Sequence, residues 1–228
     1  MSEPVRFQPA SDDSLLVYFG DSLNGGAHQQ MQKMLHLLES EPPAAVRNLH
    51  PAYCSILIDF DTLKITHAQL EAVLGDYLRR AGSLQLPEPR TIEIPACYEP
   101  EFAPDLAEAA RMHGLTINQA IELHSSTLYE VYFLGFVPGF AYLGELPAQL
   151  VSPRHAGPRA KVPPGSVGIA DNQTGVYPFA TPGGWQLIGR TPLALFRADR
   201  KNMSFLNVGD RVRFTPISRA EFAIAQNR

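Results

Sequence analysis

Residues 161–196, KVPPGSVGIADNQTGVYPFATPGGWQLIGRTPLALF, decide the fold of the C-terminal part of the chain. In this stretch, short apolar runs alternate with clusters of glycine and proline. Such a pattern predicts short strands joined by tight turns. It begins after Tyr129 and continues to the run DRVRF at residues 210–214. The second half of the chain is therefore predicted to form an all-β barrel or sandwich.

The first third of the chain has a different pattern, in which apolar strands alternate with amphipathic helices. Residues 14–19 and 55–60 are short apolar runs typical of strands. Residues 27–40 and 66–82 carry apolar side chains at helical spacing, which predicts helices with one packed face. The second of these helices opens with the capping-box pattern THAQ. We expect a small two-layer α/β domain over residues 1–86.

A proline-rich segment, LPEPR at residues 86–90, separates the two patterns, and we interpret it as a linker. A strand is predicted over residues 91–95, followed by two short helices. Each of these helices opens with a capping-box pattern, one at Asp105 and one at Thr116. The predicted fold class is α+β, in which residues 87–228 form a β-barrel domain with two short helices at its start.

The bulk properties exclude several classes of function. The chain has 228 residues, a net charge of −4 and a pI of about 6.0, which argues against nucleic acid or an anionic membrane as the main partner. Its two cysteines, Cys54 and Cys97, are too few for a disulfide framework. There is no apolar signal-peptide core and no run of about 18 apolar residues. We therefore expect a cytoplasmic protein.

The stretch YFGDSLNGG at residues 18–26 resembles the nucleophile block of GDSL-type esterases. Those enzymes need a histidine base with an aspartate three residues before it. None of the seven histidines has an aspartate at that distance, and no histidine follows His155. Because a serine without a base is a poor nucleophile, we interpret Ser22 as part of a turn between strand and helix. Zinc-ligand, P-loop and dinucleotide patterns are also missing, so no metal site is predicted.

The unusual residues of the chain gather in the loops of its second half. Arg154, His155, Arg159 and Lys161 lie close together in the sequence, among prolines. Arginine and lysine bind carboxylates and phosphates, and histidine exchanges protons near neutral pH. Glycines in such loops let backbone N–H groups approach a ligand. A set of barrel turns with a solvated basic face explains the same residues equally well.

Three segments of this region resemble the KipI/PxpB family, also called the allophanate hydrolase subunit 1 family. They are HSSTLYEVYFLGFVPGFAYLG at residues 124–144, PRHAGPRAKVPPGSVGIADNQTGVYPFATPGGWQLIGRTPLALF at residues 153–196, and GDRVRF at residues 209–214. The resemblance extends over nearly the whole chain and is looser over residues 5–86. It implies a small N-terminal α/β domain followed by a C-terminal cyclophilin-like β-barrel.

The resemblance also implies a function. It indicates the B component of an ATP-dependent 5-oxoprolinase, which converts 5-oxo-L-proline to L-glutamate together with PxpC-like (KipA-like) and PxpA-like partner subunits. ATP, with Mg²⁺, is then a co-substrate of the complex, no tightly bound cofactor is expected, and the chain is expected to be inactive alone. Two other functions stay open: a KipI-type inhibitor that binds a sensor histidine kinase, and a carboxyltransferase-type or allophanate-related subunit. Self-association of the isolated chain also stays open.

These considerations give three sets of candidate site residues. His124 and His155 are the candidate acid–base groups, although a structural role at a helix end is equally expected for His124. The second set is expected to bind substrate or phosphate: Arg154, Arg159, Lys161, Gly165, Ser166, Gln173, Gly183, Gly184, Trp185 and Arg190. The third set is expected to shape a pocket or contact a partner: Phe136, Pro138 and Phe140.

Overall fold

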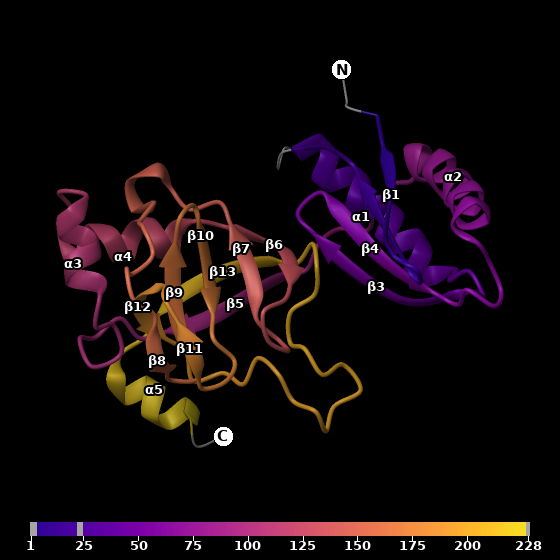
Figure 1. Ribbon diagram of the computed structural model, residues 1–228. Coiled ribbons are helices and arrows are strands. Elements are labelled where there is room, and N and C mark those ends of the chain that lie inside the picture. The colour runs from indigo at the N-terminus through magenta and orange to yellow at the C-terminus, as the bar shows by residue number, and fades with distance from the viewer. Residues whose placement is uncertain (1–3, 22–24, 227–228) are drawn as a thin grey trace. The chain divides into compact units, whose positions relative to one another are not determined.

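The computed structural model describes residues 4–21 and 25–226 (Figure 1). The chain divides into two units, Met1–Glu88 and Pro89–Arg228. The division falls within the proline-rich segment at residues 86–90. Ser22, which we assign to a turn, lies outside the described residues.

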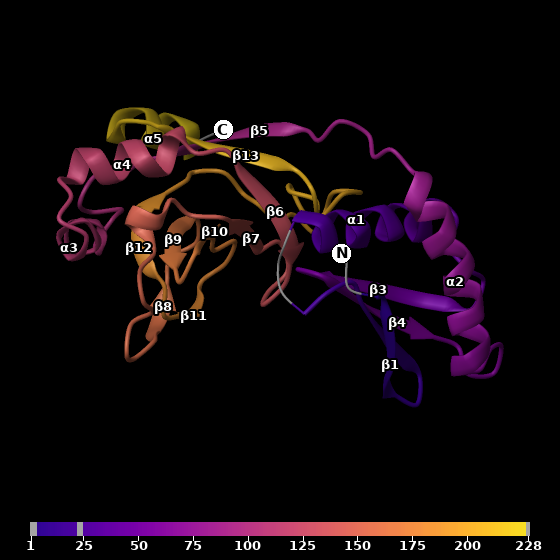
Figure 2. The ribbon, with the colours of Figure 1, turned by 90° about the horizontal axis from the view of Figure 1, so that it is seen from above.

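The N-terminal unit is a four-stranded antiparallel sheet with two helices. Its strand order is β1-β2-β4-β3. Leu15 and Val17 of β2 and Ile56 and Ile58 of β4 are fully buried, so the sheet has one packed face. Figure 2 shows α1 and α2 on the same side of this sheet. The elements are β1 (Arg6–Ser11), β2 (Ser14–Tyr18), α1 (Gly25–Ser40), β3 (Val46–Ala52), β4 (Ser55–Phe60) and α2 (His67–Ser83).

The predicted strands and helices of this unit are all present, and the capping box of α2 forms as predicted. The Thr66 hydroxyl accepts the Gln69 N–H at 3.3 Å, and the Gln69 side chain accepts the Thr66 N–H at 2.9 Å. The sequence pattern missed β1 and β3, which contain prolines and few apolar residues. Both are edge strands, where a residue without an N–H is tolerated.

The C-terminal unit is a seven-stranded sheet that closes almost completely on itself. Its strand order is β12-β9-β10-β7-β6-β13-β5, and only the pair β13–β5 is parallel. The two outer strands meet where Cys97 and Arg190 exchange backbone hydrogen bonds of 2.8 and 2.9 Å. The predicted fold class, α+β with a barrel-like C-terminal part, is therefore confirmed.

The helices of this unit and two further strands lie around this barrel (Figure 1). The strands β8 and β11 form a separate two-stranded sheet. The strands of the whole C-terminal unit are β5 (Thr91–Ala96), β6 (Tyr129–Leu134), β7 (Ala141–Gly144), β8 (Arg159–Val162), β9 (Ser166–Ala170), β10 (Gln173–Val176), β11 (Thr181–Gly183), β12 (Gln186–Arg190) and β13 (Arg211–Pro216). The helices are α3 (Leu106–Met112), α4 (Ile117–Ser126), the 3₁₀ turn η1 (Ala148–Leu150) and α5 (Arg219–Gln226).

Strand β9 is buried along its whole length because both of its faces are packed. Val167 and Ile169 contribute to the main core of the unit. Ala170, on the opposite face, belongs to a second cluster that contains Phe140, Tyr177 and Trp185. Side chains alternate between the faces of a strand, so the two cores are separated by the sheet itself. The second cluster leads to the candidate site.

The sequence predicts two capping boxes in this unit; the prediction at Thr116 is confirmed and the one at Asp105 is wrong. At α4 the Thr116 hydroxyl accepts the Gln119 N–H at 3.2 Å, and the reciprocal bond is present. At α3 the Asp105 side chain makes no capping hydrogen bond. Its carboxylate instead accepts the backbone N–H of Leu187 in β12 at 2.6 Å. A buried tertiary partner has displaced the local one.

None of the described helices combines the length and the apolar composition that crossing a lipid bilayer requires.

Candidate functional site

The carboxylate of Asp105 is the centre of a polar cluster at the start of α3. It is only 9% exposed, and each oxygen has partners. Oδ1 accepts Arg159 Nη2 at 2.5 Å, and Oδ2 accepts the Leu187 N–H at 2.6 Å. The backbone N–H of Asp105 also donates to the Leu187 carbonyl at 3.0 Å. These bonds fix Asp105 to strand β12, so its charge is held in one place.

His155 is the second partner of this carboxylate. Its Nε2 lies 3.3 Å from Asp105 Oδ2, and the side chain is 31% exposed. That nitrogen is buried and has no hydrogen-bond geometry to any described atom. The backbone N–H of His155 donates to the carbonyl of Gly184 at 2.8 Å, which fixes the loop that carries the imidazole. The exposed surface of the His155 side chain therefore comes from atoms other than Nε2.

Arg159 reaches Asp105 from strand β8. Its guanidinium is 31% exposed and also lies 3.4 Å from the Trp185 carbonyl, through Nη1. Lys161 is two residues further along β8 and shares a face of the strand with Arg159, because side chains alternate. Within the described residues, Lys161 forms no ion pair. The strand thus presents on one face a cation paired with an acid, Arg159, and a cation, Lys161, with no acidic partner among the described residues.

Gly183 lies opposite Arg159 in the β8–β11 pair. A Cβ atom at this position would lie 2.5 Å from the Tyr177 hydroxyl, so only glycine permits this approach. Gly183 and Gly184 therefore support the cluster through their backbone: the first admits Tyr177, and the second holds His155.

Aromatic side chains form an apolar wall beside the polar cluster. The Trp185 ring lies 5.4 Å from Phe140, 5.8 Å from Tyr142 and 6.5 Å from Tyr177, in edge-to-face contacts. Burial raises the pKa of both tyrosines, so their phenols stay protonated and can donate hydrogen bonds at neutral pH. Tyr142 and Tyr177 are the site residues, besides Asp105, that the sequence pattern did not single out.

Arg154 lies over this wall. Its guanidinium carbon is 6.0 Å from the Trp185 ring, and its Nε donates to Asp171 at 3.1 Å. Both members of this ion pair are more than half exposed, so the pair itself contributes little stability. Of the predicted cations, Arg154, Arg159 and His155 are therefore brought together around Trp185 and Asp105.

Gly165, Ser166 and Arg190 form a turn of their own. The N–H of Gly165 donates to the backbone carbonyl of Tyr177 at 2.7 Å, and the N–H of Ser166 donates to the carbonyl of Pro163 at 3.3 Å. Arg190 Nε donates to the carbonyl of Pro164 at 2.8 Å. The backbone donors of Gly165 and Ser166 are committed to carbonyls of the protein, so these two residues explain the shape of the barrel better than the binding of an anion. Arg190 uses one of its five N–H donors in this turn.

His124 lies in the main core, where its side chain has no exposed surface. One ring nitrogen contacts the Tyr98 hydroxyl at 2.8 Å and the other contacts the Thr174 hydroxyl at 2.9 Å. Burial lowers the pKa of His124 to about 3, so the imidazole is neutral at physiological pH. We therefore propose the structural role for His124, in place of proton exchange with a substrate.

The other predicted residues lie around the aromatic wall or behind it. Gln173 is buried in β10, opposite Ala170 and Gly144. Phe140 is buried within the wall, whereas Pro138 is exposed. Phe136 is 59% exposed, has a φ of 67°, and touches Phe140 edge-on at 5.6 Å. A large side chain held outward at a costly backbone angle fits the prediction of a pocket or partner contact.

Within residues 4–21 and 25–226, no three His, Cys, Asp or Glu side chains gather in a way that could hold a metal ion. The cluster gathers two arginines, a histidine and two phenols beside an apolar wall, and Lys161 lies on the same face of β8 as Arg159. Three exposed or half-exposed cations suit a carboxylate, and the wall suits a small ring.

The family model described as "Carboxyltransferase domain, subdomain C and D" matches residues 5–206 of the chain. The B component of 5-oxoprolinase from Bacillus subtilis (strain 168) is 36% identical over 230 residues, which cover 96% of this chain and 96% of that protein. The B component of 5-oxoprolinase from Escherichia coli O157:H7 is 59% identical over 130 residues, 57% of this chain and 60% of that protein. The chain therefore belongs to the carboxyltransferase-domain family and, within it, to the KipI/PxpB proteins.

A solved structure, that of TTHA0988, is similar in fold. It superimposes with a TM-score of 0.80 and 33% sequence identity over 90% of this chain. The match covers 40% of TTHA0988, so this chain spans less than half of the length of that protein.

Proposed function

We propose that this chain is the B component of an ATP-dependent 5-oxoprolinase, which converts 5-oxo-L-proline to L-glutamate together with PxpC-like and PxpA-like subunits. The observation that carries the proposal is the end-to-end similarity to the Bacillus subtilis protein, which covers 96% of both chains. The arrangement of Asp105, His155 and Arg159 beside Trp185 supports it, because this cluster suits a small ring that carries a carboxylate. Since ATP is a cytoplasmic substrate, we place the complex in the cytoplasm.

The proposed reaction proceeds in steps that the site can assist. The lactam oxygen takes the γ-phosphoryl group of ATP, ADP leaves, and the ring carbon becomes a better electrophile. Water adds to that carbon, the C–N bond breaks, and the nitrogen takes a proton as it becomes an amine. A second water then hydrolyses the resulting acyl phosphate to the carboxylate and inorganic phosphate.

In this scheme His155 exchanges the protons of water and amine. Asp105 lies behind the imidazole, 3.3 Å from His155 Nε2. Arg154, Arg159 and Lys161 hold the substrate carboxylate, while the aromatic wall around Trp185 contacts the ring. Asp105 is a positioning residue, since it acts through Arg159 and His155.

The charges at this cluster suit the substrate carboxylate better than a triphosphate. Asp105 offsets the charge of Arg159, and Asp171 offsets that of Arg154. Lys161 is the one cation of this cluster that has no acidic partner among the described residues. We therefore propose that the PxpC-like or PxpA-like partner supplies most of the contacts to Mg²⁺-bound ATP.

Reconstitution tests this function. The purified chain is mixed with its PxpC-like and PxpA-like partners, and 5-oxoproline-dependent ATP hydrolysis and glutamate release are measured. We expect both activities in the complete mixture and neither without this chain. A complete mixture of folded, associated subunits that releases no glutamate would rule out the proposal.

A carboxyltransferase-type or allophanate-related subunit is the second candidate, favoured by the description of the family model that matches residues 5–206. The same reconstitution separates the two, because this candidate predicts no activity that depends on 5-oxoproline. A carboxyl transfer assay with a carboxylated biotin donor would then detect the alternative activity.

A further inference from the structure

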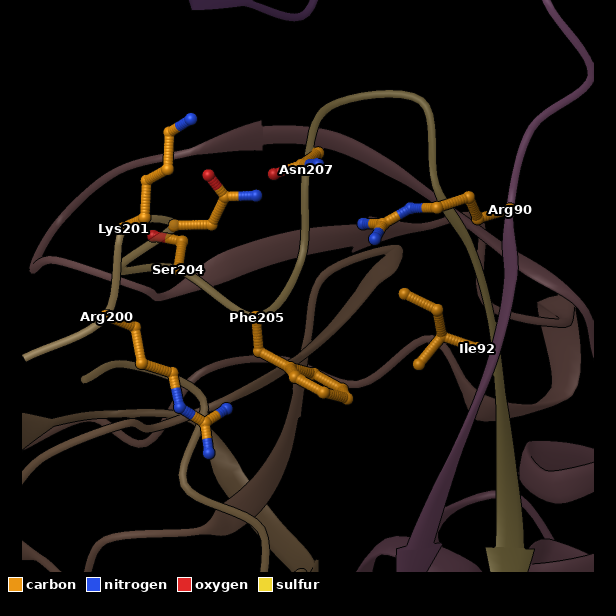
Figure 3. Close-up of a pocket in the computed structure, with 8 residues that line it drawn as sticks. Arg90, Ile92, Arg200, Lys201, Ser204, Phe205 and Asn207 are labelled. Carbon is orange, nitrogen blue, oxygen red and sulfur yellow. The ribbon is translucent and has the colours of Figure 1, made fainter.

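A pocket in the C-terminal unit shares no residue with the Asp105 cluster. It has a volume of about 420 Å³, within the range of pockets that hold small molecules. Figure 3 shows Arg90 and Ile92 on one side and Ser204, Phe205 and Asn207 on the other. The pocket is lined by Arg90, Ile92, Arg200, Lys201, Asn202, Ser204, Phe205 and Asn207.

Arg90 is held in position by a buried acid. Its Nε donates to Asp210 Oδ1 at 2.9 Å, and its Nη2 donates to Asp210 Oδ2. Asp210 is 5% exposed, and its backbone carbonyl accepts the Val131 N–H at 2.9 Å. A guanidinium has five N–H donors, and this two-point contact uses two of them. Arg90 therefore presents further N–H donors in a fixed orientation.

The facing segment is also held by backbone bonds. The N–H of Arg197 donates to the Met203 carbonyl at 2.8 Å, and the N–H of Phe205 donates to the Leu195 carbonyl at 2.9 Å. Asp210 reaches this segment too, since its Oδ2 accepts the Asn207 N–H at 2.7 Å. One buried carboxylate thus ties both sides of the pocket together.

The pocket carries unopposed positive charge on a chain whose net charge is −4. Asp210 offsets Arg90, and Asp199 offsets Arg197 at 2.8 Å. Arg200 and Lys201 form no ion pair with any side chain in the described part of the sequence. Lys and Arg are the natural partners of carboxylate and phosphate, whereas a purely solvated face has no need of a fixed Arg90.

The uncharged residues that line the pocket indicate which further groups a ligand would carry. Phe205 and Ile92 supply an apolar surface, and Asn202, Ser204 and Asn207 supply neutral hydrogen-bond groups. From this combination, we propose that the pocket binds a small organic anion in which a carboxylate or phosphate group adjoins an apolar or planar part. The anionic group contacts Arg90, Arg200 and Lys201, and the planar part lies on Phe205.

Calorimetric titration of the full chain tests this site with three probes: L-glutamate, inorganic phosphate and ADP without Mg²⁺. We expect saturable binding of at least one probe, and the choice among them separates a carboxylate ligand from a phosphate ligand. The double variant Arg200→Ala/Lys201→Ala is expected to weaken that binding at least tenfold. Both side chains are exposed, so this variant should keep the fold.

The matched control is Arg79→Ala/Arg111→Ala, which removes two exposed cations elsewhere. It should bind like the unmodified chain. The proposal is overturned if no probe binds at millimolar concentration. It is also overturned if Arg200→Ala/Lys201→Ala binds as tightly as the control. Because the readout is binding to the isolated chain, the result is independent of oxoprolinase activity.

Discussion

Asp105 Oδ1 lies 2.5 Å from Arg159 Nη2, although 54 positions separate the two residues in the sequence. This bond joins the start of α3 to strand β8. The same carboxylate accepts the N–H of Leu187 and lies against His155. Three segments that are distant in the sequence therefore share one buried charge, and we expect the activity of the complex to depend on it.

Asp105→Asn removes this charge while keeping the shape of the side chain. We expect kcat of the reconstituted complex to fall at least tenfold, because Arg159 and His155 lose their common partner. The free energy of unfolding should fall by about 1–3 kcal/mol, the usual cost of a damaged buried polar contact. Asp199→Asn, at an exposed acid paired with Arg197, is the control and should change neither value. An unchanged kcat in Asp105→Asn would remove Asp105 from the mechanism.

His155→Gln tests proton exchange. Glutamine keeps polarity but cannot exchange a proton near neutral pH, so kcat should fall by about 10²–10⁴-fold with a smaller change in KM. His36→Gln, at an exposed position of α1, serves as the control. An unchanged kcat in a folded, associated His155→Gln complex would contradict this role.

Gly165→Ala tests the structural role that we assign to the turn at Gly165. Its φ is +79°, and an added Cβ would lie 2.2 Å from the Thr191 carbonyl oxygen. Strain and clash together should lower the free energy of unfolding by more than about 2 kcal/mol in a urea titration. The matched control is Gly157→Ala, where an added Cβ meets nothing within 4 Å. Equal stabilities for the two variants would show that the turn is not constrained.

The neutral, buried imidazole of His124 makes stability depend on pH. Burial lowers its pKa from 6.5 to about 3, so the unfolded chain binds one proton more than the folded chain between these values. Stability should therefore fall as the pH falls through this window, with up to about 1.4 kcal/mol per pH unit from this group. We expect His124→Gln to be less stable at pH 7 and to lack this part of the slope. If the slopes of urea-derived stability against pH are identical in both proteins, His124 is charged in the folded state.

The sequence predicted most elements because their signals are local. The apolar spacing of α1 and the reciprocal bonds of Thr66 and Gln69 involve residues within a few positions of one another. The capping box predicted at Asp105 does not form, because a backbone N–H 82 positions away donates to the same carboxylate. No local pattern carries that information, so the residue that organises the site was interpreted as a helix cap.

The candidate site was predicted in part for the same reason. Arg154, His155 and Arg159 are close in the sequence, and the structure brings them together at Trp185. Arg90 and Asp210, in contrast, are 120 positions apart, and nothing in the sequence links them to Arg200. The pocket beside Arg90 therefore becomes visible only once the barrel has closed.

In the proposed function, the Asp105–His155–Arg159 cluster binds and converts 5-oxoproline. The most direct measurement is glutamate release by the reconstituted complex that contains Arg159→Ala, with Arg111→Ala as the control. A charge-assisted hydrogen bond contributes about 1.5–3 kcal/mol, so Arg159→Ala should reduce kcat/KM by at least tenfold while the subunits still associate. The control should retain full activity. Full activity of a folded, associated Arg159→Ala complex would show that this cluster does not bind the substrate.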